Sequence, residues 1–293
     1  MSNGILYSAS YNPYTNELSL VDRTGNTICT FEVPTAQPMT DDRAKPLKFV
    51  AMSPNSTVTL SENGTTGSTF ETSTDGGTTW NAYTLGTAIT LVKESDSVDF
   101  RCSHLGSQSS TNYVQFSMTG SVSAYHNATS MIDAAFPNIS QVGSYGMYKL
   151  FYGCASLVRA PLLPCQSLGS YAYASMFEGC TGLMESPILS AVNVAGSTGC
   201  YNRVFYGCSS LTKITCMAES EMVMVSGTAD NRRHSYPYTG DWTTGVPSSG
   251  DFYYPVTFIM YGDQWAPQAP TPGTLSGAYG GIPQGWTTHD LNS

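Results

Sequence analysis

The amino-acid sequence predicts a mainly β fold with a short α/β solenoid in its second half. Three observations lead to this prediction. Only 11% of the 293 residues are charged, whereas 41% are hydrophobic and 12% are aromatic, which is typical of a folded chain with a large core. Short apolar runs separated by turn residues continue to about residue 124, as in β-rich domains. A segment between Tyr145 and Met217 then holds three copies of one pattern, and repeat units of about 20–50 residues stack to bury their apolar faces.

These observations divide the chain into five parts. We expect an N-terminal β meander at residues 1–33, a linker at 34–46, an immunoglobulin-like β-sandwich at 47–124, repeats at 125–217 and an aromatic C-terminal cap at 218–293. The length allows two or three domains of ordinary size.

The N-terminal part contains three short strand patterns, at residues 5–11, 17–21 and 27–33. Three strands of this size bury too little apolar surface to be stable alone. We therefore expect the meander to attach the chain to copies of itself or to another protein, and the alternative is that it packs on the next domain. Residues 34–46 contain three prolines, which favours a semi-rigid linker.

The second part carries seven strand patterns with turn signals between them, as in immunoglobulin-like sandwiches. The expected strands are residues 47–52, 57–60, 69–74, 79–83, 88–92, 97–102 and 114–119. Within this part, residues 73–80 read Ser-Thr-Asp-Gly-Gly-Thr-Thr-Trp and match the Asp-box pattern of sialidases. The chain has one copy, whereas a propeller needs several blades, so we interpret the motif as a stabilised hairpin turn.

Each repeat copy supplies the same anchor residues, spaced by 26 and then 28 positions. The expected internal ladders are Phe151, Phe177 and Phe205; Cys154, Cys180 and Cys208; and Leu157, Leu183 and Leu211. An amphipathic segment such as residues 147–151 is expected before each Gly-Cys turn, and an extended segment such as 156–158 after it. Residues 125–144 are expected to cap the first unit, with His126 in a structural role. After Met217 the pattern lapses.

The repeat resembles a known family. Residues 176–183, Met-Phe-Glu-Gly-Cys-Thr-Gly-Leu, followed by Pro187 and Leu189, are similar to the BspA-type leucine-rich repeat, which occurs in surface proteins of gut Bacteroidetes and in their phages. The resemblance implies recognition by a surface rather than catalysis. It also implies a phage head or tail fibre, commonly a homotrimer, whose residues 1–33 bind a capsid or tail protein and whose repeats meet a host-surface glycan or protein.

The expected location is therefore the virion, assembled in the host cytoplasm. The first residues contain no basic and apolar signal segment, which agrees with this expectation. The alternative is a bacterial cell-surface adhesin whose signal peptide has been removed.

The C-terminal part is rich in aromatic residues, and side chains of this kind beside carboxylates suit sugars. Our candidate glycan-binding residues are Trp242, Tyr254, Trp265 and Tyr279 with Asp241 and Asp263. The alternative for each aromatic is a place in a packed cap.

Other functions are disfavoured by the composition. A formal net charge of −9 repels phosphate backbones, so no nucleic-acid partner is expected. No apolar run approaches the roughly 18 residues of a membrane span. The eight cysteines include no Cys-x-x-Cys pair, so we expect no metal site and no cofactor. Glycoside hydrolysis needs two facing carboxylates, and no motif pairs Asp241, Asp251 or Asp263, so we expect no catalytic residues and no enzyme.

Overall fold

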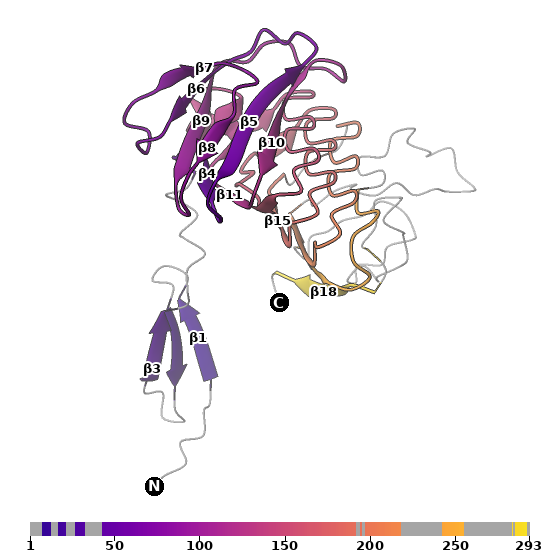
Figure 1. Cartoon of the computed structure of the whole chain (residues 1–293). Coiled ribbons are helices and arrows are strands. Elements are labelled where there is room, and N and C mark those ends of the chain that lie inside the picture. Colours follow the sequence, from indigo (N-terminus) through magenta and orange to yellow (C-terminus); the bar gives the residue numbers. More distant parts are fainter. Residues whose placement is uncertain are drawn as a thin grey trace, which may run out of the picture. The chain divides into compact units, whose positions relative to one another are not determined.

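The computed structural model describes residues 8–12, 17–21, 27–32, 43–191, 194, 197–217, 242–254, 283 and 285–291 (Figure 1). The chain divides into two compact units, Met1–Asp42 and Arg43–Ser293. The mainly β prediction is confirmed, because the described residues form β-strands and only two short 3-10 helices, η1 (Ala128–Met131) and η2 (Phe136–Asn138). The expected α-helical share of the solenoid is wrong: no α-helix occurs in the described part of the chain.

The first unit holds a three-stranded antiparallel sheet of β1 (Ser8–Asn12), β2 (Glu17–Val21) and β3 (Thr27–Glu32) in the order β1-β2-β3. The pairing sets Ser10 opposite Ser19, and Ser19 opposite Thr30. This backbone agrees with the meander that the sequence predicts, and residues 5–7 and 33 of the expected strands lie outside the described residues. The expected turns and residues 34–42 of the expected linker also lie outside the described residues.

The second unit begins with two sheets that face each other. Their strands are β4 (Leu47–Ala51), β5 (Ser56–Asn63), β6 (Thr69–Ser73), β7 (Asn81–Tyr83), β8 (Ile89–Leu91), β9 (Ser97–His104), β10 (Tyr113–Thr119) and β11 (Val122–Tyr125). One sheet has the order β10-β5-β8 and the other β13-β11-β4-β9-β6-β7, where β13 (Leu157–Arg159) comes from the repeats. The rings of Phe49 in β4 and Phe116 in β10 meet across the sheets, with centroids 4.7 Å apart.

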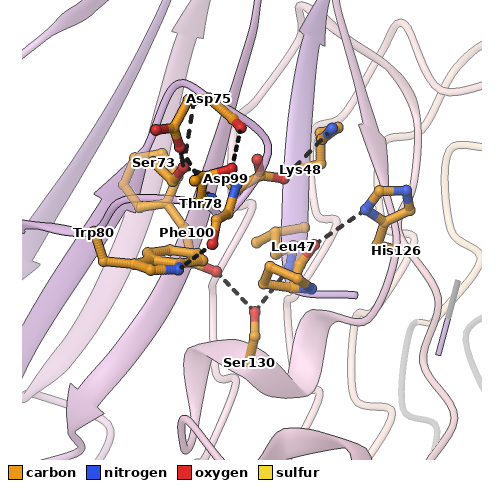
Figure 2. Close-up of polar contacts among 12 residues, drawn as sticks. Leu47, Lys48, Ser73, Asp75, Thr78, Trp80, Asp99, Phe100, His126 and Ser130 are labelled. Atoms are coloured by element: carbon orange, nitrogen blue, oxygen red, sulfur yellow. Dashed lines mark hydrogen bonds and ion pairs between the residues drawn. The ribbon is translucent and has the colours of Figure 1, made fainter. Parts of the chain in front are cut away.

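The Asp-box motif forms the turn between β6 and β7, which pair antiparallel. The carboxylate of Asp75 accepts hydrogen bonds from the Thr79 hydroxyl at 2.6 Å and the Thr79 backbone N–H at 2.9 Å. It also accepts from the Ser73 hydroxyl at 2.7 Å (Figure 2). These bonds hold the pKa of Asp75 well below its usual value. The Trp80 indole N–H donates to the Gly77 carbonyl. Every one of these contacts stays within the hairpin, so the motif stabilises a turn.

Two buried polar groups fasten β4 to its neighbours (Figure 2). The Ser130 hydroxyl accepts from the Leu47 backbone N–H and donates to the Phe100 carbonyl, both at 2.9 Å. The Asp99 carboxylate, whose side chain is 3% exposed, lies 3.8 Å from the Lys48 ammonium. Burial raises the pKa of Asp99 to about 6, although Lys48 opposes the shift. His126 lies with Nδ1 3.2 Å from the Pro46 carbonyl oxygen, which agrees with the expected structural role.

The repeat units are built from consecutive turns instead of amphipathic helices. Every second backbone N–H donates to the carbonyl three residues earlier, as that of Tyr148 does to Tyr145. The N–H groups between them donate to carbonyls of the next unit, as that of Lys149 does to Ala174. A left-handed residue recurs every four positions to make this possible. The residues with positive φ are Tyr145, Lys149 and Gly153; Tyr171, Ser175 and Gly179; and Gly199, Arg203 and Gly207. The expected amphipathic segment at 147–151 therefore has no α-helical bonding.

The expected ladder residues all lie in the core, where they are at most 2% exposed. Phe151 stacks on Phe177 with ring centroids 5.4 Å apart, and Phe177 stacks on Phe205 at 5.9 Å. The stack begins earlier than the repeats, because Phe116 of the sandwich lies 5.5 Å from Phe151 at an interplanar angle of 14°. The sandwich and the repeats thus share one continuous hydrophobic core, without a break at the expected boundary of 124/125.

The extended parts of successive units pair in parallel. Strands β12 (Gln141–Val142) and β14 (Ser167–Leu168) form one pair. Strands β15 (Glu185–Leu189), β16 (Lys213–Cys216), β17 (Asp251–Tyr254) and β18 (Thr287–Asp290) form a four-stranded sheet in that order. In Figure 1 the units are seen as stacked loops that lead to this sheet.

The expected lapse of the pattern after Met217 is wrong for the backbone. The Gly207 N–H donates to the Thr244 carbonyl, as the Gly179 N–H does to Tyr206. Gly245 then takes the left-handed conformation of Gly207. Thr243 and Val246 occupy the places of the repeat Phe and Cys, and for this reason the sequence pattern hides the unit.

Candidate functional site

An open pocket of about 500 Å³ lies on the outer face of the repeats. The first unit contributes Tyr145, Tyr148, Lys149 and Tyr152; the second contributes Tyr171, Ala174, Ser175 and Glu178; and the third contributes Asn202 and Arg203. Ser110, from the loop before β10, completes the lining. The pocket therefore needs all three copies of the repeat in register.

The hollow exists because the middle unit carries small residues where its neighbours carry large ones. Ala174 stands at the position of Tyr148 and Asn202, and Ser175 stands at that of Lys149 and Arg203. The backbone is the same in each case, since Lys149, Ser175 and Arg203 all have φ between 53° and 56°. At these positions the units therefore differ in side-chain size and not in backbone conformation.

Tyrosines form the wall beside this hollow. Tyr145 stacks on Tyr171, with ring centroids 5.0 Å apart at 15°. Tyr148 meets Tyr145 edge-on at 5.4 Å, and Tyr113 of β10 meets Tyr148 at 5.3 Å. The row ends at Gly199, where a Cβ would lie 2.6 Å from the Tyr171 ring. Rings locked against one another in this way form a preorganised surface with little side-chain entropy left to lose on binding.

Two cations and one carboxylate line the pocket. Arg203 donates to Glu178 at 2.6 Å and lies over the Tyr206 ring, 3.9 Å from its centroid. The Lys149 ammonium lies 4.9 Å from the Tyr152 ring centroid, and no carboxylate in the described part of the chain forms an ion pair with it. Partial burial lowers the pKa of Lys149, but the neighbouring tyrosines, first Tyr148, outweigh this effect and raise it overall. The lysine is therefore charged at neutral pH.

The polar atoms of this arrangement are tyrosine hydroxyls, an amide, an ammonium and a salt bridge, set beside aromatic carbon. Such a surface can bind a ligand that has both apolar C–H faces and many hydroxyls. Removal of a proton by the one carboxylate, Glu178, competes with its bond to Arg203.

Of the residues that the sequence analysis selected for glycan binding, Trp242 is the one whose side chain the structure describes. Trp242 is 1% exposed, with its ring 6.4 Å from Phe205 and 6.0 Å from Phe252, so it packs in the core and is not a binding platform. The backbone of Tyr254 ends β17. Its side chain lies outside the described residues, as do Asp241, Asp263, Trp265 and Tyr279.

Sequence reasoning missed the pocket because it followed the positions where the copies agree. The pocket residues are the positions where the copies differ: Tyr148-Lys149, Ala174-Ser175 and Asn202-Arg203. An alignment of the three copies on their Phe and Cys anchors shows this contrast. The sequence therefore contained a signal for the position of the pocket.

Within the residues that the structure describes, no group of three or more His, Cys, Asp and Glu side chains could hold a metal ion. The same residues contain no helix long and apolar enough to cross a membrane. Comparisons with protein-family models, with curated proteins and with solved structures gave no significant match.

Proposed function

We propose that this chain is a non-enzymatic recognition protein, which binds saccharides of a cell surface in the pocket between Tyr145 and Arg203. The observation that carries the proposal is the hollow over Ala174 and Ser175, walled by locked tyrosines. Tyrosine presents apolar ring surface and a hydroxyl at a small cost in side-chain entropy, and sugars offer C–H faces and hydroxyls in return.

Binding suits the pocket better than hydrolysis. Glycoside cleavage needs an acid and a second carboxylate on either side of the scissile bond, about 5–10 Å apart. Glu178 is the one acidic residue of the lining, and its carboxylate is paired with Arg203. These features support a surface that holds a sugar without cleaving it.

The fold that we propose for the second unit is an immunoglobulin-like sandwich continued by a BspA-type solenoid. The facing sheets and the unit-to-unit hydrogen bonds of the repeats support this assignment. Stacked units of this kind give an extended face on which variable side chains can form a binding surface.

Attachment is assigned to the N-terminal sheet. Its three strands form a unit separate from residues 43–293, and a sheet of this size needs a further surface for stability. Together with the resemblance to the repeats of gut phages, this supports a head or tail fibre of a virion, a homotrimer held to a capsid or tail protein by residues 1–33. The alternative is a bacterial cell-surface adhesin whose signal peptide has been removed.

The experiment is to incubate the full chain with a panel of purified bacterial surface polysaccharides, and to measure binding and newly formed reducing ends in the same samples. The expected result is saturable binding to a subset of the panel without release of reducing ends. Release of reducing ends would establish an enzyme, and absence of binding throughout the panel would contradict the pocket's proposed role.

A further inference from the structure

The pocket has an unbalanced positive charge in a protein that is acidic overall. The formal net charge of the chain is −9, yet the lining carries Lys149 and Arg203 against Glu178 alone. Glu178 and Arg203 neutralise each other at 2.6 Å. No carboxylate of the lining therefore neutralises the positive charge of Lys149 at the pocket wall.

The position of Lys149 is fixed by the rings around it. Its ammonium lies 5.4 Å from the Tyr113 centroid, 5.3 Å from that of Tyr148 and 4.9 Å from that of Tyr152. Contacts of this type hold a cation without neutralising it. The three rings come from β10 and from the first repeat unit, so the charge is placed by the junction between the sandwich and the repeats.

We propose that the pocket selects acidic saccharides, with the Lys149 ammonium binding the carboxylate of a hexuronic or sialic acid residue. The inference rests on the proposed function, since it names the class of sugar that the same pocket prefers. The tyrosine wall contacts the sugar ring, and Ser175 leaves room beside Lys149 for the carboxylate. Arg203 contributes less, because Glu178 already occupies its guanidinium.

A hydrogen bond between a charged donor and a charged acceptor is among the stronger single contacts in a binding site. Loss of this contact is expected to weaken binding about tenfold, the size typical of one charged hydrogen bond. Because the pocket is open to solvent, salt also weakens the contact.

The test uses the full chain and three probes, an oligogalacturonate, sialyllactose and a hyaluronan oligosaccharide, each beside its carboxyl-reduced counterpart. The reduced forms keep the sugar ring and lose only the charge. The expected result is that the tightest ligand is an acidic form and that reduction of its carboxylate weakens binding about tenfold. Lys149→Gln should weaken binding of the acidic form by the same factor and leave binding of the reduced form unchanged.

Lys213→Gln is the matched control, because Lys213 also lies over a tyrosine ring, that of Tyr253, but away from the pocket. It should change neither affinity, and Lys149→Arg, which keeps the charge, should retain the preference. The inference would be overturned if the acidic and reduced forms bound equally. The proposed function would still stand in that case if Ala174→Tyr, which fills the pocket, abolished the binding of both forms. Equal losses for both forms in Lys149→Gln would overturn the inference as well. Absence of binding to all six probes counts against both.

Discussion

The Cys180 thiol donates a hydrogen bond to the Phe151 carbonyl of the preceding repeat unit, with 3.1 Å between sulfur and oxygen. The same bond joins Cys154 to Phe116 at 3.1 Å and Cys208 to Phe177 at 3.0 Å. The Phe151 and Phe177 carbonyls also accept backbone N–H bonds from Cys154 and Cys180 of their own units. The cysteine ladder therefore adds a second bond, from the next unit, to these carbonyls, in addition to filling space beside the phenylalanine stack.

This bond predicts the order of stability of two variants of the repeat core. Cys180→Ala removes both donor and volume and should lower the free energy of unfolding by about 1–2 kcal/mol. Cys180→Ser keeps a donor and should cost less than Cys180→Ala. Chemical denaturation of the wild type and both variants measures the order. If serine costs more than alanine, the position requires only an apolar filler and the hydrogen bond contributes nothing.

The cysteines of the second unit should be unreactive in the native protein. None of the seven forms a disulfide and all are buried. Burial raises the pKa of Cys154 and Cys208 to about 12, so almost no thiolate exists near about pH 8. In a Cys29→Ser background, a disulfide reagent should label none of them before unfolding and all seven after it. Rapid labelling of a native thiol would show that one unit opens locally.

Asp99 predicts a pH dependence of stability. Its pKa rises from 3.8 in the unfolded chain to about 6 in the folded protein, so the folded state holds the proton longer. Stability from this group is complete below the unfolded pKa and is lost as the pH rises through about 6. Relative to the wild type, Asp99→Asn should therefore gain about 2–3 kcal/mol in unfolding free energy between acidic and neutral pH. Glu94→Gln, at an exposed position, is the control and should show a flat difference; a flat difference for Asp99→Asn too would mean that its pKa is ordinary.

The N-terminal sheet predicts the association state. The full chain should sediment as a trimer, whereas residues 43–293, which contain their own continuous core, should sediment as a monomer with unchanged thermal unfolding. Sedimentation velocity of the two proteins at matched concentrations measures this. The same association state for both would remove self-assembly from the role of these strands.

Much of the scaffold could be predicted from local pattern. The Phe, Gly, Cys and Leu anchors recur because each unit must bury the same face on its neighbour, and such regularity is visible in the sequence. Strand β4 of the sandwich alternates buried and partly exposed residues, and period two is a strong signal.

The rest depended on contacts that no local pattern contains. Phe116 joins the ladder from a strand of the sandwich, and Thr243 and Val246 continue the repeat without its anchor residues. The amphipathic segments form turns because Lys149, Ser175 and Arg203 adopt positive φ. Lysine, serine and arginine do not indicate this conformation in a sequence. Trp242, selected as an exposed aromatic, is buried because it packs on Phe205 at the end of the stack.

The central claim is that the hollow over Ala174 is the binding site, and filling it tests this claim most directly. Ala174→Tyr introduces the residue that the first unit carries at the same position, on the same backbone. Because Ala174 is 1% exposed, the unfolding temperature of the variant is measured together with its binding. Binding to the polysaccharide that the wild type prefers should fall at least about tenfold, with unfolding temperature preserved, whereas Tyr125→Ala, which removes an aromatic side chain outside the pocket, should bind normally. Undiminished binding by a folded Ala174→Tyr would contradict the account and place recognition elsewhere on the chain.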